Sequence, residues 1–217
     1  MPQIERRTLE KALSLCNAKA MVTSFYDDRL AYPDEDVQLR KGICKTLAEE
    51  YSPLVRLAQE YCFIRSIRLL PEANPGPDGE IRFWWQRPSK VQIVCANEGY
   101  NRALMRELLA HGNVVFSRQN RHRDQGTRKV VSTGRALMAP ATDIQARVQR
   151  ILETIDSKEK KYYSGTDTLL IQEDVANFRH LREGGLHRMV CDSIQKRTAT
   201  PYRRIYINYG NELKRLR

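Results

Sequence analysis

The stretch that most constrains the fold is residues 77–116, where strand-like and helix-like patterns follow one another closely. Residues 80–86 and 91–96 indicate two neighbouring strands, and the second is apolar enough to lie inside a sheet. Residues 100–110 place leucines and a methionine at helical spacing, and residues 114–116 indicate another strand. Strands separated by a helix favour an α/β protein with a mixed sheet.

The same alternation continues on both sides of this stretch. We expect helices over residues 5–28 and 35–61, the second with a break or kink near Pro53 because proline lacks a backbone donor. Further strands and helices are expected at 63–70, 129–132, 142–162, 167–172, 176–195 and 204–208. The sequence thus predicts a central mixed β-sheet flanked by helices. It divides the chain into an N-terminal helical extension (1–44) and an α/β core (45–217).

The composition is that of a globular protein. The 217 residues are 41% hydrophobic and 29% charged, enough to build one buried core. The sequence contains no run of about 20 apolar residues and no apolar segment near its start, so we expect a cytoplasmic protein without a membrane partner. The five cysteines form no C-x-x-C pair, which favours buried, reduced thiols.

The positive charge is unevenly distributed. The formal net charge is +11, and the excess gathers in residues 118–130 and 187–217, where arginine outnumbers lysine. A guanidinium group matches the geometry of a phosphate, so nucleic acid is a candidate partner, and a solvated basic surface is the alternative. The candidate phosphate contacts are Arg121, Arg123, Arg128 and Lys129.

Two consecutive tryptophans lie within one expected strand. Trp84 and Trp85 would point to opposite faces there, so one of them is expected to be exposed and able to stack on a base. Packing of one ring in the core, with partial burial of the other, is the alternative.

The order of expected elements resembles the restriction-endonuclease-like superfamily, the PD-(D/E)XK nucleases, over about residues 45–210. The stretches LAEEYSPLVRLAQEY, VQIVCANEGYNRALMRELL and YYSGTDTLLIQED contribute to the resemblance. It implies an aspartate at the start of the second core strand and a (D/E)-x-K pair on the third. It also implies a glutamate from the preceding helix and Mg²⁺ bound by the carboxylates.

The resemblance can be carried over residue by residue. Asp78, after Pro77, matches the aspartate, and Glu49 or Glu50 would supply the helical carboxylate. Gln92 and Val94 stand at the two third-strand positions, so the carboxylate and the lysine are both replaced. Asp78 and Glu49 are then the candidate Mg²⁺ ligands, and Gln92 would orient the attacking water. A turn role for Asp78 and simple solvation of the glutamates are the alternatives.

Three functions follow from these patterns. The first is a metal-dependent nuclease, with DNA favoured over RNA as substrate. The second is a protein of the same fold that binds nucleic acid without cutting it. The third is a catalytically inactive protein-interaction module, whose N-terminal helices would be a dimerisation element and make the chain a homodimer.

Overall fold

A computed structural model describes residues 4–27, 42–71, 76–96, 121–123, 130–132, 140–173, 185–196, 200–209 and 212–217. Its helices are α1 (Arg6–Glu10), α2 (Leu15–Asp27), α4 (Gly42–Lys45), the π-helix η2 (Thr46–Tyr51), α5 (Ser52–Gln59), α7 (Pro140–Lys160) and α9 (Leu186–Gln195). Its strands are β1 (Ile64–Leu69), β2 (Gly79–Phe83), β3 (Ser89–Cys95), β4 (Arg121–Arg123), β5 (Val130–Ser132), β6 (Thr168–Gln172), β7 (Arg204–Tyr209) and β8 (Glu212–Arg215). The expected helix at 100–110 and strand at 114–116 lie outside these residues.

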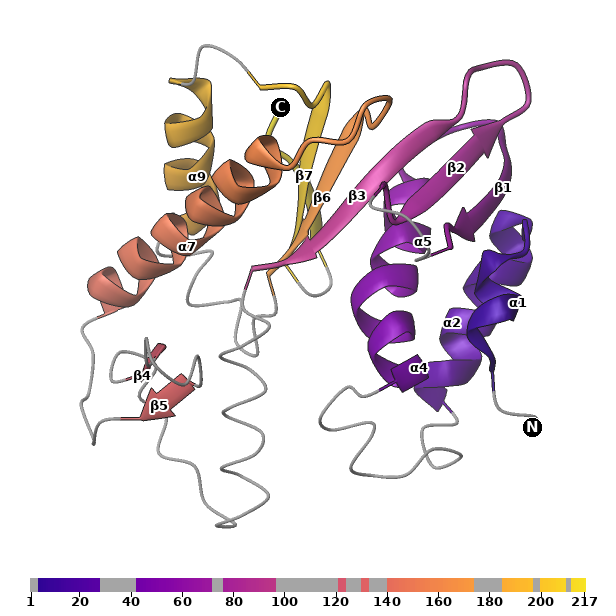
Figure 1. The fold of residues 1–217 in the computed structure, drawn as a ribbon, viewed down its shortest axis with the longest axis horizontal. Coiled ribbons are helices and arrows are strands. Elements are labelled where there is room, and N and C mark those ends of the chain that lie inside the picture. The colour runs from indigo at the N-terminus through magenta and orange to yellow at the C-terminus, as the bar shows by residue number, and fades with distance from the viewer. Residues whose placement is uncertain are drawn as a thin grey trace.

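The centre of the molecule is a six-stranded mixed sheet in the order β1-β2-β3-β6-β7-β8. Strands β1, β2 and β3 form an antiparallel meander, β3, β6 and β7 are parallel, and β8 returns antiparallel to β7. The sheet curls between two groups of helices, with α1, α2 and α5 on one side and α7 and α9 on the other (Figure 1). The predicted α/β class with a mixed, helix-flanked sheet is confirmed.

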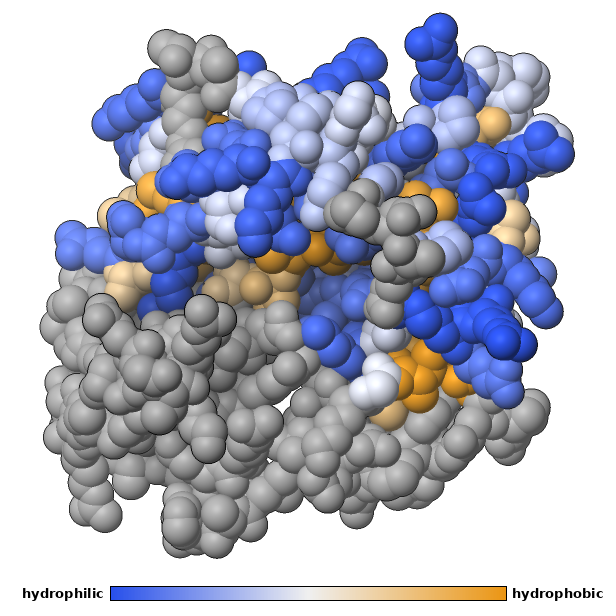
Figure 2. Space-filling model, in the orientation of Figure 1, coloured by the Kyte–Doolittle hydropathy of each residue, from blue (hydrophilic) through white to orange (hydrophobic). Residues whose placement is uncertain are grey.

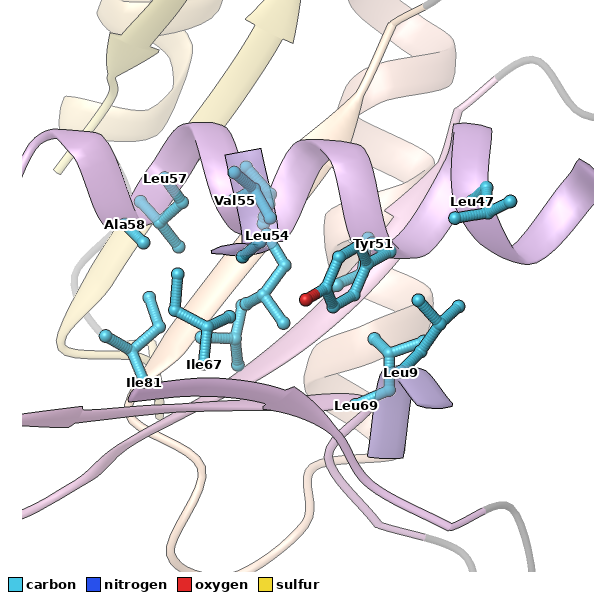
Figure 3. Packing of buried hydrophobic residues seen from close by; sticks show 14 of the residues in the cluster. Leu9, Leu47, Tyr51, Leu54, Val55, Leu57, Ala58, Ile67, Leu69 and Ile81 are labelled. Carbon is cyan, nitrogen blue, oxygen red and sulfur yellow. The ribbon is translucent and has the colours of Figure 1, made fainter. Parts of the chain in front are cut away.

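The first core lies between the helical segment α4–η2–α5 and the meander. Leu54, Leu57 and Tyr51 are fully buried against Ile67 and Ile81, and Figure 3 shows the helix laying this apolar side over the strands. The side chains alternate along each strand, so only one face of the meander joins this core. Each fully buried leucine or isoleucine stabilises the fold by about 1.5–3 kcal/mol.

The second core lies on the other face of the sheet. The predicted stripe of α7 is buried there at Ile144, Val148, Ile151 and Ile155, at the spacing of one helix face. Strand β6 serves both cores, because Leu170 packs in the first and Leu169 and Ile171 pack in the second. This double burial explains why residues 169–171 are all apolar.

The single helix expected over residues 5–28 is wrong, because the chain breaks between α1 and α2. Leu13 forms a bridge with Ile67 there, with N–H···O distances of 3.0 and 2.8 Å in the two directions. The backbone of Leu13 therefore bonds to the outer side of β1 and cannot continue a helix.

The chain does not break near Pro53, since residues 42–59 form one continuous helical segment, but the turn before the proline is irregular. The turn before the proline is a π-helix, in which the Ser52 N–H donates to the Leu47 carbonyl five residues earlier. A wider turn accommodates the missing donor and the bulk of a proline ring. Residues 35–41 of the expected helix lie outside the described chain.

Strand ends differ in two places from the prediction. Strand β2 ends at Phe83 and not at residue 86, which leaves Trp84 and Trp85 in a bend and both strongly exposed. The expectation that one tryptophan packs in the core is therefore wrong. Strand β8 was missed, because Glu212–Arg215 is a short, charged segment without apolar alternation.

The outer surface is predominantly polar. Figure 2 shows hydrophilic side chains over most of the described part of this face, with apolar atoms set back between them. Among the described helices, none combines the length and the apolar character that crossing a membrane requires.

Candidate functional site

Asp78 lies where strands β2 and β3 separate. Its N–H donates to the Val91 carbonyl at 2.9 Å, and its Oδ2 accepts the Ile93 N–H at 2.6 Å. These two bonds flank Gln92, so Asp78 stands directly opposite Gln92 across the strand pair. The residue after Asp78 is a glycine, and helix α5 passes close to it. A Cβ on Gly79 would lie only 2.6 Å from Leu54 Cδ2.

Gln92 is buried on the face of the sheet that α7 covers. Its Oε1 accepts a short hydrogen bond from the Tyr202 hydroxyl, which also lies 3.1 Å from the Lys158 carbonyl oxygen at the end of α7. Burial raises the pKa of Tyr202, and the negative charges of Glu159 and Asp78 raise it further. The Tyr202 hydroxyl is therefore a neutral group surrounded by oxygen atoms.

The structure brings Asp78 and Gln92 together and adds two residues that sequence reasoning missed. Glu159 comes from the end of α7, and Tyr202 precedes β7. Neither residue stands in a motif, and the hydrogen bonds of Tyr202 to Gln92 and to the Lys158 carbonyl depend on how the end of α7 and the segment before β7 pack against the sheet. No local signal in the sequence could have found them.

The two predicted helical carboxylates lie on η2. Glu50 Oε2 is 3.5 Å from Arg6 Nη1, whereas Glu49 is only 5% exposed. Helix η2 packs against the face of β3 that carries Val91 and Ile93, and Gln92 points to the opposite face. The backbone thus places η2 on one side of β3 and the Gln92 amide on the other.

Two residues flank Gln92 on its own face of β3. Val94 packs against the second core, so an apolar side chain occupies the position at which the family has a lysine. Lys90 lies outside the strand expected at 91–96 but within β3, two residues before Gln92. Its side chain is exposed and shares the face of Gln92.

A row of charged residues crosses the meander beside this point. Arg68, Glu80 and Lys90 are direct cross-strand neighbours on β1, β2 and β3. Glu80 Oε1 accepts bonds from Arg68 Nε at 3.0 Å and from Arg82 Nε at 2.5 Å. Burial alone would raise the pKa of Glu80, but the bonds from Arg82 and Arg68 outweigh it and keep this pKa below its ordinary value.

The charged row carries a net positive charge on one face of the sheet. Three cations surround the single ionised carboxylate of Glu80, and the Arg82 side chain is 41% exposed. These residues alternate with Ile67, Ile81 and Val91, which are buried in the first core. We call Arg68, Glu80, Arg82 and Lys90 the charged row below.

The predicted phosphate contacts are only partly within the described residues. Arg121 and Arg123 lie in β4, which pairs antiparallel with β5, with Arg121 opposite Ser132 and Arg123 opposite Val130. Arg128 and Lys129 lie outside the described chain. Their common role as a phosphate-binding segment stays a prediction.

The resemblance implies a metal, and the described residues do not complete a site for one. Asp78 Oδ2 accepts the Ile93 N–H, and the Gln92 oxygen accepts the Tyr202 hydroxyl. Within the described part of the chain, no group of three or more His, Cys, Asp or Glu side chains is placed to hold an ion. Mg²⁺ binding by Asp78 and Glu49 stays a prediction, and we derive no chemical step from it.

Comparisons of this chain with family models, with curated proteins and with solved structures find no match.

Proposed function

We propose that this chain is a nucleic-acid-binding protein with a restriction-endonuclease-like core, and that phosphates contact the charged row. The observation that carries the proposal is the partly exposed, positive face of β1, β2 and β3, which adjoins the Asp78–Gln92 pair. Phosphate contacts by arginine and lysine supply most of the affinity of non-specific nucleic-acid binding.

The arrangement of elements supports the restriction-endonuclease-like part of the proposal. A helical segment precedes three antiparallel strands, and helices α7 and α9 precede the parallel strands β6 and β7. This order is consistent with the resemblance found in the sequence. Asp78 also stands at the start of the second strand, opposite the third-strand position of Gln92.

The same geometry favours binding over cleavage. Val94 offers no ammonium group near an attacking water, and Gln92 offers an amide that already accepts the Tyr202 hydroxyl. We therefore expect tight, salt-sensitive binding and little or no metal-dependent cutting. DNA as the preferred ligand stays a prediction from the sequence.

The proposal is tested with two substitutions, one that lowers the net positive charge of the charged row and one that raises it. Lys90→Gln removes a cation from the charged row, and Glu80→Gln removes its only anion. We expect Lys90→Gln to weaken duplex DNA binding a few-fold and to lower the slope of log K against log salt by about 1. Glu80→Gln should strengthen binding, because the positive potential of the row increases.

Fluorescence anisotropy with labelled DNA and RNA over a range of salt concentrations measures both effects. Lys19→Gln is the matched control, because Lys19 is exposed on α2 and α2 packs on the other side of the sheet. Equal effects of Lys90→Gln and Lys19→Gln would contradict the assignment of the charged row. Absence of salt-sensitive binding would favour the protein-interaction module instead.

Cleavage is tested in the same samples with Mg²⁺, with Mn²⁺ and with a chelator. Asp78→Asn keeps an oxygen that can accept the Ile93 N–H, so the backbone contact survives while the negative charge is lost. Metal-dependent cutting that disappears in Asp78→Asn would establish a nuclease and overturn our expectation of binding alone.

A further inference from the structure

Three exposed aromatic side chains gather at the end of β2 that is remote from Asp78. Phe63, Trp84 and Trp85 are 65%, 60% and 78% exposed. The Trp84 N–H donates to the Phe63 carbonyl at 3.1 Å, and the rings of Phe63 and Trp85 meet edge to face at 5.2 Å between centroids. Large apolar rings grouped on a surface indicate an interaction site.

The backbone is irregular just where these rings are presented. Phe63 has a φ of 60°, which is unfavourable for a bulky side chain. The register between β1 and β2 then shifts between Ile64 and Ser66, so Arg65 is the extra residue of a β-bulge. The strained backbone at Phe63 and the bulge at Arg65 both lower the stability of the fold, and a role of these residues in binding would explain why they are retained.

The cluster has arginines around it. The Arg65 guanidinium lies over the Trp84 ring, 5.5 Å from its centroid, and Arg87 is exposed two residues after Trp85. Every side chain of residues 61–70 and 81–92 that is charged at neutral pH is a cation. A protein partner would need a strongly acidic surface here, whereas a polynucleotide combines flat bases with negative charge.

Partly buried aromatic residues support the cluster from inside the sheet. Tyr61 and Phe83 pack edge to face at 5.5 Å, and Arg204 lies over the Tyr61 ring at 5.4 Å. The exposed rings therefore lie in bends whose neighbouring residues Tyr61 and Phe83 are packed against one another.

We propose that Phe63, Trp84 and Trp85 form a stacking platform for the bases of single-stranded nucleic acid, with Arg65 and Arg87 contacting its phosphates. The proposal rests on the proposed function, since it names the class of polynucleotide that the protein takes. Stacking suits single strands because their bases are accessible, and it tolerates any sequence. Strand β2 separates the platform from Asp78 by about 16 Å, so one strand could contact the platform and the charged row together.

The chain offers a direct readout, because Trp84 and Trp85 are its only two tryptophans. Intrinsic tryptophan fluorescence of the full chain therefore reports on the platform alone. We expect an unlabelled single strand of about 12 nucleotides to quench this fluorescence, and a blunt duplex hairpin of the same length to quench it much less.

Affinity is measured in parallel by anisotropy with labelled single-stranded and duplex probes. Trp85→Ala should weaken single-strand binding about tenfold and change duplex binding less than twofold. Trp85→Phe is the matched control, since it keeps an aromatic face and should retain most of the affinity. Thermal unfolding of each variant shows whether the fold is intact, which we expect because the Trp85 ring is exposed.

The outcomes separate this proposal from the function on which it rests. Binding of both probes with unchanged tryptophan emission, or equal losses in Trp85→Ala for both probes, would overturn the platform and leave the charged row in place. Binding of neither probe would overturn both proposals and make a protein partner the occupant of the aromatic cluster.

Discussion

Tyr51 and Tyr202 are both buried, but their hydroxyl groups differ in hydrogen bonding. Tyr202 donates to Gln92 and also lies 3.1 Å from the Lys158 carbonyl oxygen, whereas the Tyr51 hydroxyl has no hydrogen-bond partner among the described residues. Burial raises the pKa of Tyr51 to about 12. Figure 3 shows its oxygen directed into the first core.

Replacement of each tyrosine by phenylalanine should therefore change stability in opposite directions. Tyr51→Phe removes an unsatisfied buried group and should leave the free energy of unfolding unchanged or raise it by about 1 kcal/mol. Tyr202→Phe leaves the buried Gln92 oxygen unpaired and should lower it by about 1–3 kcal/mol. Urea unfolding of the two variants measures the difference, and a loss in Tyr51→Phe equal to that in Tyr202→Phe would contradict the contrast.

Among the residues of the candidate site, the sequence predicted only those whose positions follow from two neighbouring strands. Asp78 and Gln92 could be related because each lies at a recognisable point of a strand pair. Glu159 and Tyr202 could not, because their approach depends on how α7 and β7 pack. The burial of Glu49 was equally hidden, since it follows from the docking of η2 on β3.

At the scale of elements, helix α9 is attached to the sheet by an ionisable contact. His187 lies 3.5 Å from the Tyr209 hydroxyl on β7 and 3.4 Å from Cys191 one turn along α9. Burial lowers the pKa of His187 from 6.5, and the positive charge of Lys214 on β8 lowers it further, against an opposite effect of Glu212. The packed contact therefore favours the neutral imidazole.

The sign of the pH effect follows from this shift. Below about pH 6.5 the unfolded chain binds a proton at His187 more readily than the folded chain does, so stability falls as pH falls through that range. We expect His187→Asn to have a shallower loss of unfolding free energy between about pH 7 and 5 than the natural chain. Urea unfolding at several pH values tests this, and parallel curves for the two proteins would contradict it.

The types of most described elements were predictable, but several of their ends were not. The stripe of α7 and the apolar run of β6 each follow from side-chain periodicity. The end of β2 at Phe83 lies opposite the positive φ of Phe63 at the start of β1, and the gap after α1 depends on the Leu13–Ile67 bridge. These contacts join residues far apart in the chain, so no local pattern reveals them.

At the scale of the whole molecule, the N-terminal helices take part in the first core. Leu9, Ala18 and Phe25 are buried in the same cluster as Ile67 and Leu69. Residue 44 lies within the continuous helical segment 42–59. The division into an N-terminal helical extension (1–44) and an α/β core (45–217) stays a prediction.

We expect residues 45–217 not to fold cooperatively without the preceding segment. The truncation would expose the apolar face of β1 and the inner side of α5, and Leu9→Ala in the full chain should already lower the unfolding free energy by about 2–5 kcal/mol. Near-ultraviolet circular dichroism and urea unfolding measure both effects, with Lys19→Gln as a surface control on α2. A sharp unfolding transition in the truncated protein would support the division at residue 44.

The two outermost strands of the sheet are poorly suited to pairing with another chain. On β1, the Leu13 bridge already occupies the backbone of Ile67, and the bulge at Arg65 interrupts the row of free donors and acceptors. On the other side, β8 is four residues long and carries Glu212, Lys214 and Arg215. Short, charged or bulged borders discourage edge-to-edge association and the growth of continuous β-aggregates. If this chain forms a homodimer, we therefore expect contact through other surfaces and not by extension of the six-stranded sheet from one copy into the next.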